Sequence, residues 1–199
     1  MPRISEVDVD NLPPNIADPT WERVAAHCPE QLVHINALMR SFADHGTMPR
    51  RYIEIAVVTV SRLNECRHCV GRHSSRLYDT GLSHETIERI LESDCPGLDE
   101  TDRLVRDYAR AVSENSATMR DGIFEALRAH FDEPQIVELT MRVGLAGFFN
   151  RFNNALQIDL DDPHFRTFLS QGGESDGLPD IEDKIIQHQS TDTLSEISR

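Results

Sequence analysis

Hydrophobic residues recur at intervals of three and four along most of the chain, the spacing of helices with one buried face. In residues 31–43 this stripe is formed by Leu32, Ile35, Leu38, Met39 and Phe42. Stripes of the same period follow in residues 104–112, 123–131 and 136–149. Neither the alternation of a half-buried strand nor an Asn-Gly hairpin turn is found. The pattern therefore predicts an all-α protein, built as a compact helical domain.

Helix and strand compete in one segment, residues 50–63. Propensity favours a strand, because most of its apolar residues are β-branched: Ile53, Ile55, Val57, Val58 and Val60. The length of the run, the start signal at Thr47 and Pro49, and the lack of polar alternation favour a buried helix. We expect a helix here.

Glycines, prolines and capping residues set the expected helix boundaries. Helices are predicted over about 21–27, with Thr20 as N-cap, and over about 66–79, with Gly81 as C-cap. Ser83 is expected to start a short helix that ends near residue 93. Pro134 falls in the first turn of a long final helix.

Both ends of the chain differ from its middle in composition. Residues 1–19 carry four prolines among acidic and small polar residues, which predicts an extended N-terminal arm. Glycines, serines and acids gather after about residue 170, so we expect an acidic C-terminal tail over 161–199. The helical domain is then expected to span residues 20–160.

Composition narrows the class of protein. The 199 residues are 39% hydrophobic and 27% charged, as in an ordinary globular domain. A net charge of −14 disfavours binding to nucleic acid or to an anionic membrane. The longest apolar runs, 55–60 and 143–149, are far shorter than the ~18 residues of a membrane span. Because an acidic stretch follows the first residues, we expect no targeting segment and a cytoplasmic protein.

Four cysteines are present, and in the cytoplasm they are not expected to form a structural disulfide framework. They are Cys28, Cys66, Cys69 and Cys95. The segment EIAVVTVSRLNECRHCVGRH, from Glu54 to His73, places two of them three residues apart, with a histidine four residues later. On a helix these three side chains form one stripe, with the cysteine Cβ atoms ~5–6 Å apart, so a disulfide can close with modest adjustment.

Such a dithiol is expected to be reactive. A helix N-terminus, nearby histidines and nearby arginines all lower the pKa of a thiol. A low-pKa dithiol can attack an oxidant, form a sulfenic acid and resolve to a disulfide. Position alone favours Cys66 as the more acidic thiol, because it is nearer the helix N-terminus. His73 is nearer Cys69 and could reverse that preference, so the order of attack stays open.

Two other interpretations of the cysteines compete with this one. Zinc could bind Cys66, Cys69, His73 and Glu54, but structural zinc sites usually take a second ligand pair from another segment, and none is present. Inert core cysteines are disfavoured, because charged residues flank the pair. We therefore expect neither a metal nor a cofactor.

Glu54 lies within the apolar run of residues 53–60. A partly buried carboxylate there would have a raised pKa, as a general base needs. An ion pair with Arg50, one helical turn earlier, is an equally good explanation of this residue.

The motif E-x11-C-x2-C-x3-H, formed by Glu54, Cys66, Cys69 and His73, resembles the signature of a known family. It is similar to the alkylhydroperoxidase D-like branch of the carboxymuconolactone decarboxylase family, and His68 between the cysteines also matches. The resemblance covers about residues 29–158. It continues around the motif in GTMPRRYIEIAVVTVSRLNECRHCVGRHSSRLYDTGLSHETI and later in LDETDRLVRDYARAV and GLAGFFNRFNNAL.

The resemblance implies an all-helical fold, a homo-oligomer (trimer or hexamer) and an oxidoreductase that reduces hydroperoxides with thiols. It implies that Glu54, His68 and His73 relay protons to Cys69, which peroxide oxidises, and that Cys66 resolves the product. The external reductant would be a lipoyl or thioredoxin-like protein, or a peroxiredoxin partner.

Two other functions stay open. One is a decarboxylase-like enzyme acting on a small organic acid, as in the family's other branch, which does not depend on a CxxC pair. The other is a dithiol protein that senses redox state or metal. Near the end of the last predicted helix, Asn150 and Asn154 share a helix face that could line a pocket, but polar contacts between helices are the favoured role of Asn150, Arg151 and Asn154. The three phenylalanines beside them are expected in the core or at a subunit interface.

Overall fold

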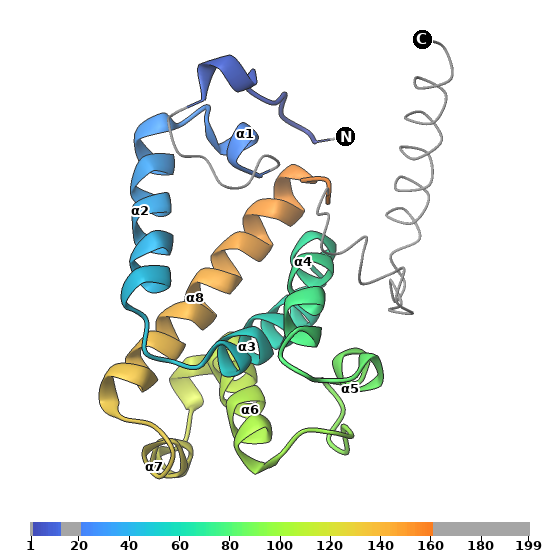
Figure 1. Cartoon of the computed structure of the whole chain (residues 1–199), viewed down its shortest axis with the longest axis vertical. Coiled ribbons are helices and arrows are strands. Elements are labelled where there is room, and N and C mark those ends of the chain that lie inside the picture. The colour runs from blue at the N-terminus through green and yellow to red at the C-terminus, as the bar shows by residue number, and fades with distance from the viewer. Residues whose placement is uncertain (1, 13–20, 161–199) are drawn as a thin grey trace.

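The structure, a computed structural model, describes residues 2–12 and 21–160, and within these ranges it contains helices and no strand. The predicted all-α class is therefore confirmed (Figure 1). Residues 1 and 13–19 of the N-terminal arm, Thr20 and the whole 161–199 tail lie outside the described residues. The elements are η1 (Val9–Asn11), α1 (Trp21–Ala25), α2 (Pro29–His45), α3 (Arg50–Leu63), α4 (Arg67–Tyr78), α5 (His84–Glu88), α6 (Glu100–Asn115), η2 (Ser116–Thr118), α7 (Asp121–Arg128) and α8 (Glu133–Leu156).

The ambiguous segment is α3, and it is a helix as expected. Every residue from 53 to 61 is buried, because α3 packs against α4, α6 and α8 at once. A helix enclosed by others is apolar around most of its circumference, so the polar alternation expected of a strand is absent. The β-branched residues that favoured a strand are here the packing surface of a central helix.

Side-chain caps fix several helix starts. Ser83 accepts a hydrogen bond from the backbone N–H of Thr86 and starts α5 as expected. Asp99 forms a capping box with Asp102 at the start of α6. α8 starts in the same way after Asp132, with Pro134 in its first turn.

Two predicted helix ends were wrong. α5 ends at Glu88 rather than near residue 93, because the chain turns around Arg89. The guanidinium of Arg89 lies 3.0 Å from Glu85 and 2.7 Å from Glu92, which holds the turn closed. The C-cap of α4 is Asp79, and Gly81 follows in the turn with φ of +93°, a conformation that strongly favours glycine.

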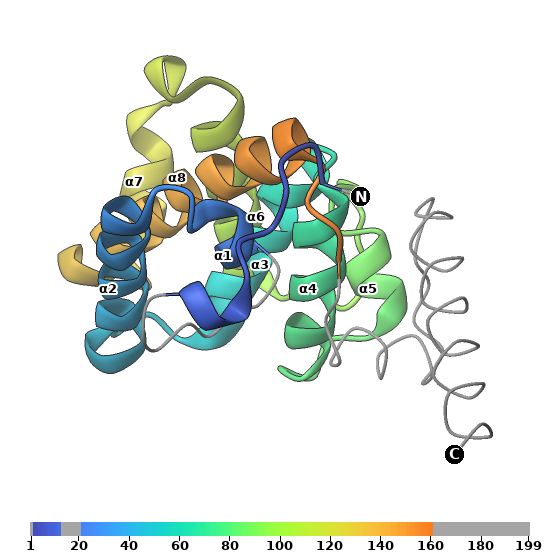
Figure 2. The ribbon, with the colours of Figure 1, turned by 90° about the horizontal axis from the view of Figure 1, so that it is seen from above.

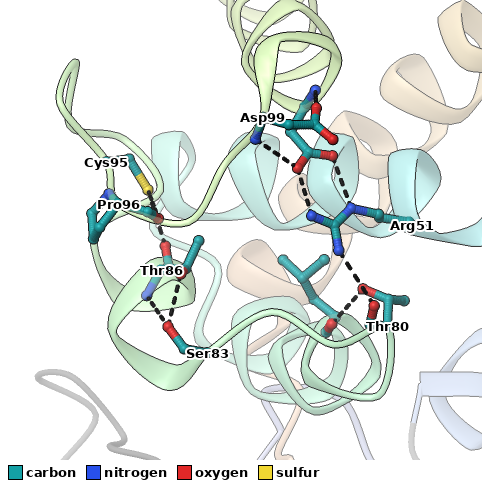
Figure 3. Close-up of polar contacts among 9 residues, drawn as sticks. Arg51, Thr80, Ser83, Thr86, Cys95, Pro96 and Asp99 are labelled. Carbon is teal, nitrogen blue, oxygen red and sulfur yellow. Dashed lines mark hydrogen bonds and ion pairs between the residues drawn. The ribbon is translucent and has the colours of Figure 1, made fainter.

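A polar cluster joins α3 to α6 and to the loop after α4 (Figure 3). Arg51 donates two hydrogen bonds to the fully buried Asp102, at 2.9 and 2.6 Å, and a third to the carbonyl of Thr80 at 3.3 Å. The hydrogen bond to Asp102 raises the pKa of Arg51. Asp102 also accepts from the backbone N–H of Asp99 at 3.1 Å, so its charge is fully engaged. This cluster fixes α3, on which α4 packs.

The long helix α8 runs diagonally across the molecule, with α2 and α4 on opposite sides of it (Figure 1). Seen from above, α1 and α3 lie between α2 and α4 (Figure 2). α1 is held against the C-terminal half of α8, because the ring of Trp21 lies 5.1 Å from that of Phe149 and 6.2 Å from that of Phe152. Among the described residues, no helix is long and apolar enough to cross a membrane.

Candidate active site

The two cysteines lie at the junction between α3 and α4. After α3 ends, Glu65 turns the chain with φ of +51°, and the backbone N–H of Cys66 bonds to the carbonyl of Ser61 at 2.9 Å. Cys66 is the N-cap residue of α4. The helix therefore starts one residue later than the predicted start at about residue 66. Cys66 and Cys69 are both free thiols, and both are buried.

The two thiols are shifted in opposite directions. Cys66 donates a hydrogen bond to the sulfur of Cys69, and this bond, together with burial, raises the pKa of Cys66. The same bond lowers the pKa of Cys69 against the opposing effect of burial. Both effects on Cys66 oppose the argument from helix position, which favoured it as the more acidic thiol. The donated hydrogen bond and burial outweigh its place at the helix N-terminus.

Amide side chains from α8 complete the surroundings of Cys69. Asn153 donates to its sulfur at 3.3 Å, and Asn150 and Ser61 lower the pKa of Cys69 further. Asn150 is held in place, because it donates to Ser61 at 3.1 Å and accepts from Asn64 at 3.0 Å. Both α8 asparagines are buried. Their hydrogen bonds stabilise a thiolate at Cys69.

Sequence reasoning missed Asn153 and favoured polar contacts between helices for Asn150, Arg151 and Asn154. Asn150 also lines a cavity beside Cys69, which was the other possibility for this residue. Asn154 bonds to the carbonyl of Asn64 after α3, whereas Arg151 bonds within α8 to the carbonyl of Gly147. The available signal was three asparagines within five residues of a helix that is otherwise largely apolar.

Glu54 and His73 form a close pair, with His73 Nδ1 2.7 Å from Glu54 Oε2. Glu54 is buried, and Arg50 also approaches it at 3.9 Å, so both neighbours considered for this residue are present. Burial alone would raise the pKa of Glu54, but the charge and hydrogen bond of His73, with Arg76 and Arg50, lower it. The predicted raised pKa was therefore wrong, because these cationic neighbours outweigh desolvation.

Burial also lowers the pKa of His73, against the opposing charge of Glu54. At neutral pH the pair is therefore a carboxylate and a neutral imidazole. The carboxylate accepts a hydrogen bond from Nδ1–H, which leaves Nε2 with its lone pair as the basic nitrogen. When the imidazole of His73 accepts a proton, the carboxylate of Glu54 balances the positive charge.

A cavity of about 210 Å³ opens in front of Cys69. His68 and His73 line it as well, and Nδ1 of His68 lies 3.0 Å from the carbonyl oxygen of Asp159. Cys66 and Glu54 do not line the cavity but contact residues that do, Cys69 and His73. The structure thus brings all five predicted site residues together around one space.

The remaining walls come from residues that sequence reasoning did not place in the site. The apolar wall contains Trp21, Met39, Val57, Leu145 and Phe149, the last of which was expected in the core or at an interface. The cationic side chains of Arg72, Arg76 and Arg142 also line the cavity. Within the described ranges, no three side chains of His, Cys, Asp or Glu gather in a way that could hold a metal ion.

Sequence comparison identifies the family of this region. Residues 29–98 match the model of the carboxymuconolactone decarboxylase family, and they contain Glu54, both cysteines of the pair and both histidines. Over these residues the match agrees with the resemblance that the motif predicted. The chain is also 31% identical over 100 residues to the uncharacterized protein YnjA of Escherichia coli (strain K12). That match covers 50% of this chain and 55% of YnjA, so the chain spans about half the length of this relative.

Solved structures with the same fold include proteins of more than one described activity. A peroxidase-related protein with an alkylhydroperoxidase AhpD core from Ralstonia eutropha JMP134 superimposes with a TM-score of 0.72 at 20% identity, over 82% of this chain and 94% of that one. The debrominase Bmp8 superimposes with a TM-score of 0.63 at 18% identity, over 81% and 85%. A variant of Bmp8 has been solved in complex with 2,3,4-tribromopyrrole. At these identities the similarity shows the shared fold.

Proposed function

We propose that the protein is a thiol-dependent peroxidase in which Cys69 attacks a hydroperoxide and Cys66 resolves the product. One observation carries this proposal. Of two thiols in mutual contact, Cys69 lines the cavity and has a lowered pKa, whereas Cys66 is buried behind it with a raised one. That is the division between an attacking thiolate and a resolving thiol.

The reaction would run in three steps. The Cys69 thiolate attacks the terminal oxygen of the hydroperoxide, so that an S–O bond forms and the O–O bond breaks. The alkoxide leaves as an alcohol, after taking up the proton that Cys69 had lost. The sulfenic acid on Cys69 then condenses with the thiol of Cys66, which releases water and forms a disulfide. An external dithiol reduces this disulfide and restores both thiols.

The Glu54–His73 pair would serve as the proton carrier. Its neutral imidazole takes the proton of Cys69, directly or through water, and returns it to the leaving alkoxide. The carboxylate of Glu54 orients the ring and stabilises the transient imidazolium. His68, which lines the same cavity, would be the second histidine of the relay.

We also propose that the protein works as a homo-oligomer in the cytoplasm, with a lipoyl or thioredoxin-like protein or a peroxiredoxin as its reductant. Exposed apolar residues support the assembly, since Val137, Met141 and Phe148 on α8 are 57%, 45% and 44% exposed. Light scattering should give the mass of a trimer or hexamer of the 22.6 kDa chain. A monomer mass at micromolar concentration would contradict the proposed assembly.

The direct test of the activity is reduction of cumene hydroperoxide by the purified full chain with a dithiol donor. Cys69→Ser should abolish turnover. Cys28→Ser is the matched control, because Cys28 is an exposed thiol outside the site, and it should keep the wild-type rate. Equal turnover by wild type and Cys69→Ser would refute the assignment.

Bmp8 raises a second candidate, in which the same dithiol reduces a halogenated aromatic compound. An aryl bromide and two thiols would give the arene, bromide, a proton and the disulfide. The apolar wall of the cavity suits an aromatic ring. Incubating the reduced protein with 2,3,4-tribromopyrrole and measuring bromide release separates this activity from peroxide reduction.

A further inference from the structure

The cavity in front of Cys69 has a positive wall in a chain that is acidic overall. Arg76 on α4 and Arg142 on α8 both line it, although the sequence has a net charge of −14. Neither guanidinium has a carboxylate within 4.0 Å among the described residues. Burial lowers the pKa of Arg142 against the opposing charges of Glu54 and Glu138. Two cations that face one partly enclosed space without a direct ion pair form a site for an anion.

The carboxylates that line the cavity or act on these arginines already have partners. Glu22, which lines the cavity, accepts a hydrogen bond from Asn36 at 2.5 Å. Glu54 accepts from His73 at 2.7 Å. Glu138, the other acid whose charge acts on Arg142, accepts from the backbone N–H groups of Thr47 and Met48 at 2.7 and 3.0 Å. The guanidinium of Arg142 is instead placed over the ring of Phe42, at 5.2 Å from its centroid. That contact holds the cation in position without neutralising it.

The rest of the cavity defines the ligand. Its apolar wall, which includes Trp21, Leu145 and Phe149, suits a hydrocarbon or aromatic body. Its volume of about 210 Å³ is smaller than the ~300–1,000 Å³ of pockets for drug-sized ligands. Arg76 lies two turns of α4 beyond Cys69, ~10.5 Å along the helix axis, so the anionic end and the sulfur are at separate ends of the space.

We propose that the cavity binds small organic carboxylates, with the carboxylate between Arg76 and Arg142 and the apolar body against the wall that contains Trp21. This inference rests on the peroxidase function proposed above. The substrate class is then a hydroperoxide that carries a carboxylate at the end remote from the O–O bond. Guanidinium groups recognise a carboxylate by paired, charge-assisted hydrogen bonds. The same arrangement disfavours neutral hydroperoxides of equal size.

Trp21 gives a readout of binding that does not depend on activity, because it lines the cavity and is the only tryptophan in the sequence. The full chain should be titrated with benzoate and with benzamide, which share an aromatic body and differ in charge. Benzoate should quench the fluorescence in a saturable way and bind at least ~10-fold more tightly than benzamide, as expected for a charge-assisted bond. Equal affinities, or no binding of benzoate, would overturn the proposal.

Variants assign the effect to the two arginines. Arg76→Gln and Arg142→Gln should each weaken benzoate binding by about 10- to 100-fold and leave benzamide unaffected. Arg142→Lys keeps the charge and should retain most of the affinity, which separates charge from packing. Arg151→Gln, on the exposed side of the same helix, is the matched control and should bind as wild type does. An equal loss in the Arg151 variant would overturn the assignment.

Kinetics distinguish failure of this inference from failure of the proposed function. Arg142→Gln should raise KM for monoperoxysuccinate by about tenfold or more relative to KM for tert-butyl hydroperoxide measured on the same variant. If both peroxides are turned over equally well and benzoate does not bind, the carboxylate site is refuted and the peroxidase function is supported. If benzoate binds tightly and neither peroxide is turned over, the carboxylate site is supported and the peroxidase function is refuted.

Discussion

Replacing Asn153 by leucine removes one hydrogen bond to the proposed nucleophile with little change in volume. The amide donates to Cys69 Sγ at 3.3 Å, while its Oδ1 has no hydrogen-bond partner among the described residues. An apolar side chain of similar size therefore leaves no new buried polar atom unsatisfied on residue 153, and the fold should survive.

The expected shift follows from the strength of that bond. A hydrogen bond to a charged group contributes about 1.5–3 kcal/mol, and one pKa unit corresponds to about 1.4 kcal/mol. Sulfur is a weak acceptor, and the bonds from Cys66, Asn150 and Ser61 remain. The lower end of the range therefore applies, and the pKa of Cys69 should rise by about one unit in Asn153→Leu.

The assay is alkylation of Cys69 by iodoacetamide as a function of pH, followed by mass spectrometry of its peptide. Asn154→Leu is the control, because Asn154 is exposed and bonds to a backbone carbonyl rather than to sulfur. It should leave the midpoint unchanged. A midpoint for Asn153→Leu within about 0.3 unit of wild type, worth about 0.4 kcal/mol, would refute the claim that this amide stabilises the thiolate.

Three further predictions concern the charged pairs. Glu54→Gln should keep the fold and slow peroxide reduction by about 10²–10⁴-fold in stopped-flow assays, since the carboxylate orients His73 as the base; an unchanged rate would contradict the relay. The pKa values of both Glu54 and His73 are lowered in the folded protein, so the unfolded chain binds more protons. The free energy of unfolding should therefore fall as the pH drops from the ordinary histidine value of 6.5 through the lowered values. Urea unfolding midpoints that rise as the pH drops would contradict the pKa directions. Arg51→Met should cost about 3 kcal/mol of unfolding free energy, because Asp102 would stay buried without its cation, whereas removal of the exposed Arg50 should cost under about 1 kcal/mol; equal losses would show that burial of the pair does not matter.

The fold was largely predictable because its determinants are local. Helical periodicity, capping serine and aspartate residues, and proline positions indicated most elements, and the length of the apolar run resolved α3 against its strand propensity. The end of α5 was not predictable in this way. It depends on contacts of Arg89 with acids on both sides of the turn, which no periodic pattern reports.

The site was predictable where it lies on one helix. Cys69 and His73 are one turn apart on α4, so their spacing alone places both on one face. The directions of the pKa shifts were not predictable. At Glu54 the neighbouring charges oppose burial, and at Cys66 its neighbour reinforces burial, which only the three-dimensional arrangement determines. Asn153 and Arg142 come from α8, and only the packing of α8 against α3 and α4 brings them to the cavity.

Identification of the thiol that peroxide oxidises tests the central claim most directly. The Cys66→Ser variant should be treated with one equivalent of cumene hydroperoxide and then with dimedone, and the labelled peptides identified by mass spectrometry. A thiolate at Cys69 that lacks its resolving partner should release one equivalent of alcohol, stall as the sulfenic acid and carry the label on Cys69. Label on Cys28 or Cys95 alone, or unconsumed peroxide with Cys69 unmodified, would contradict the assignment of Cys69 as the peroxidatic nucleophile.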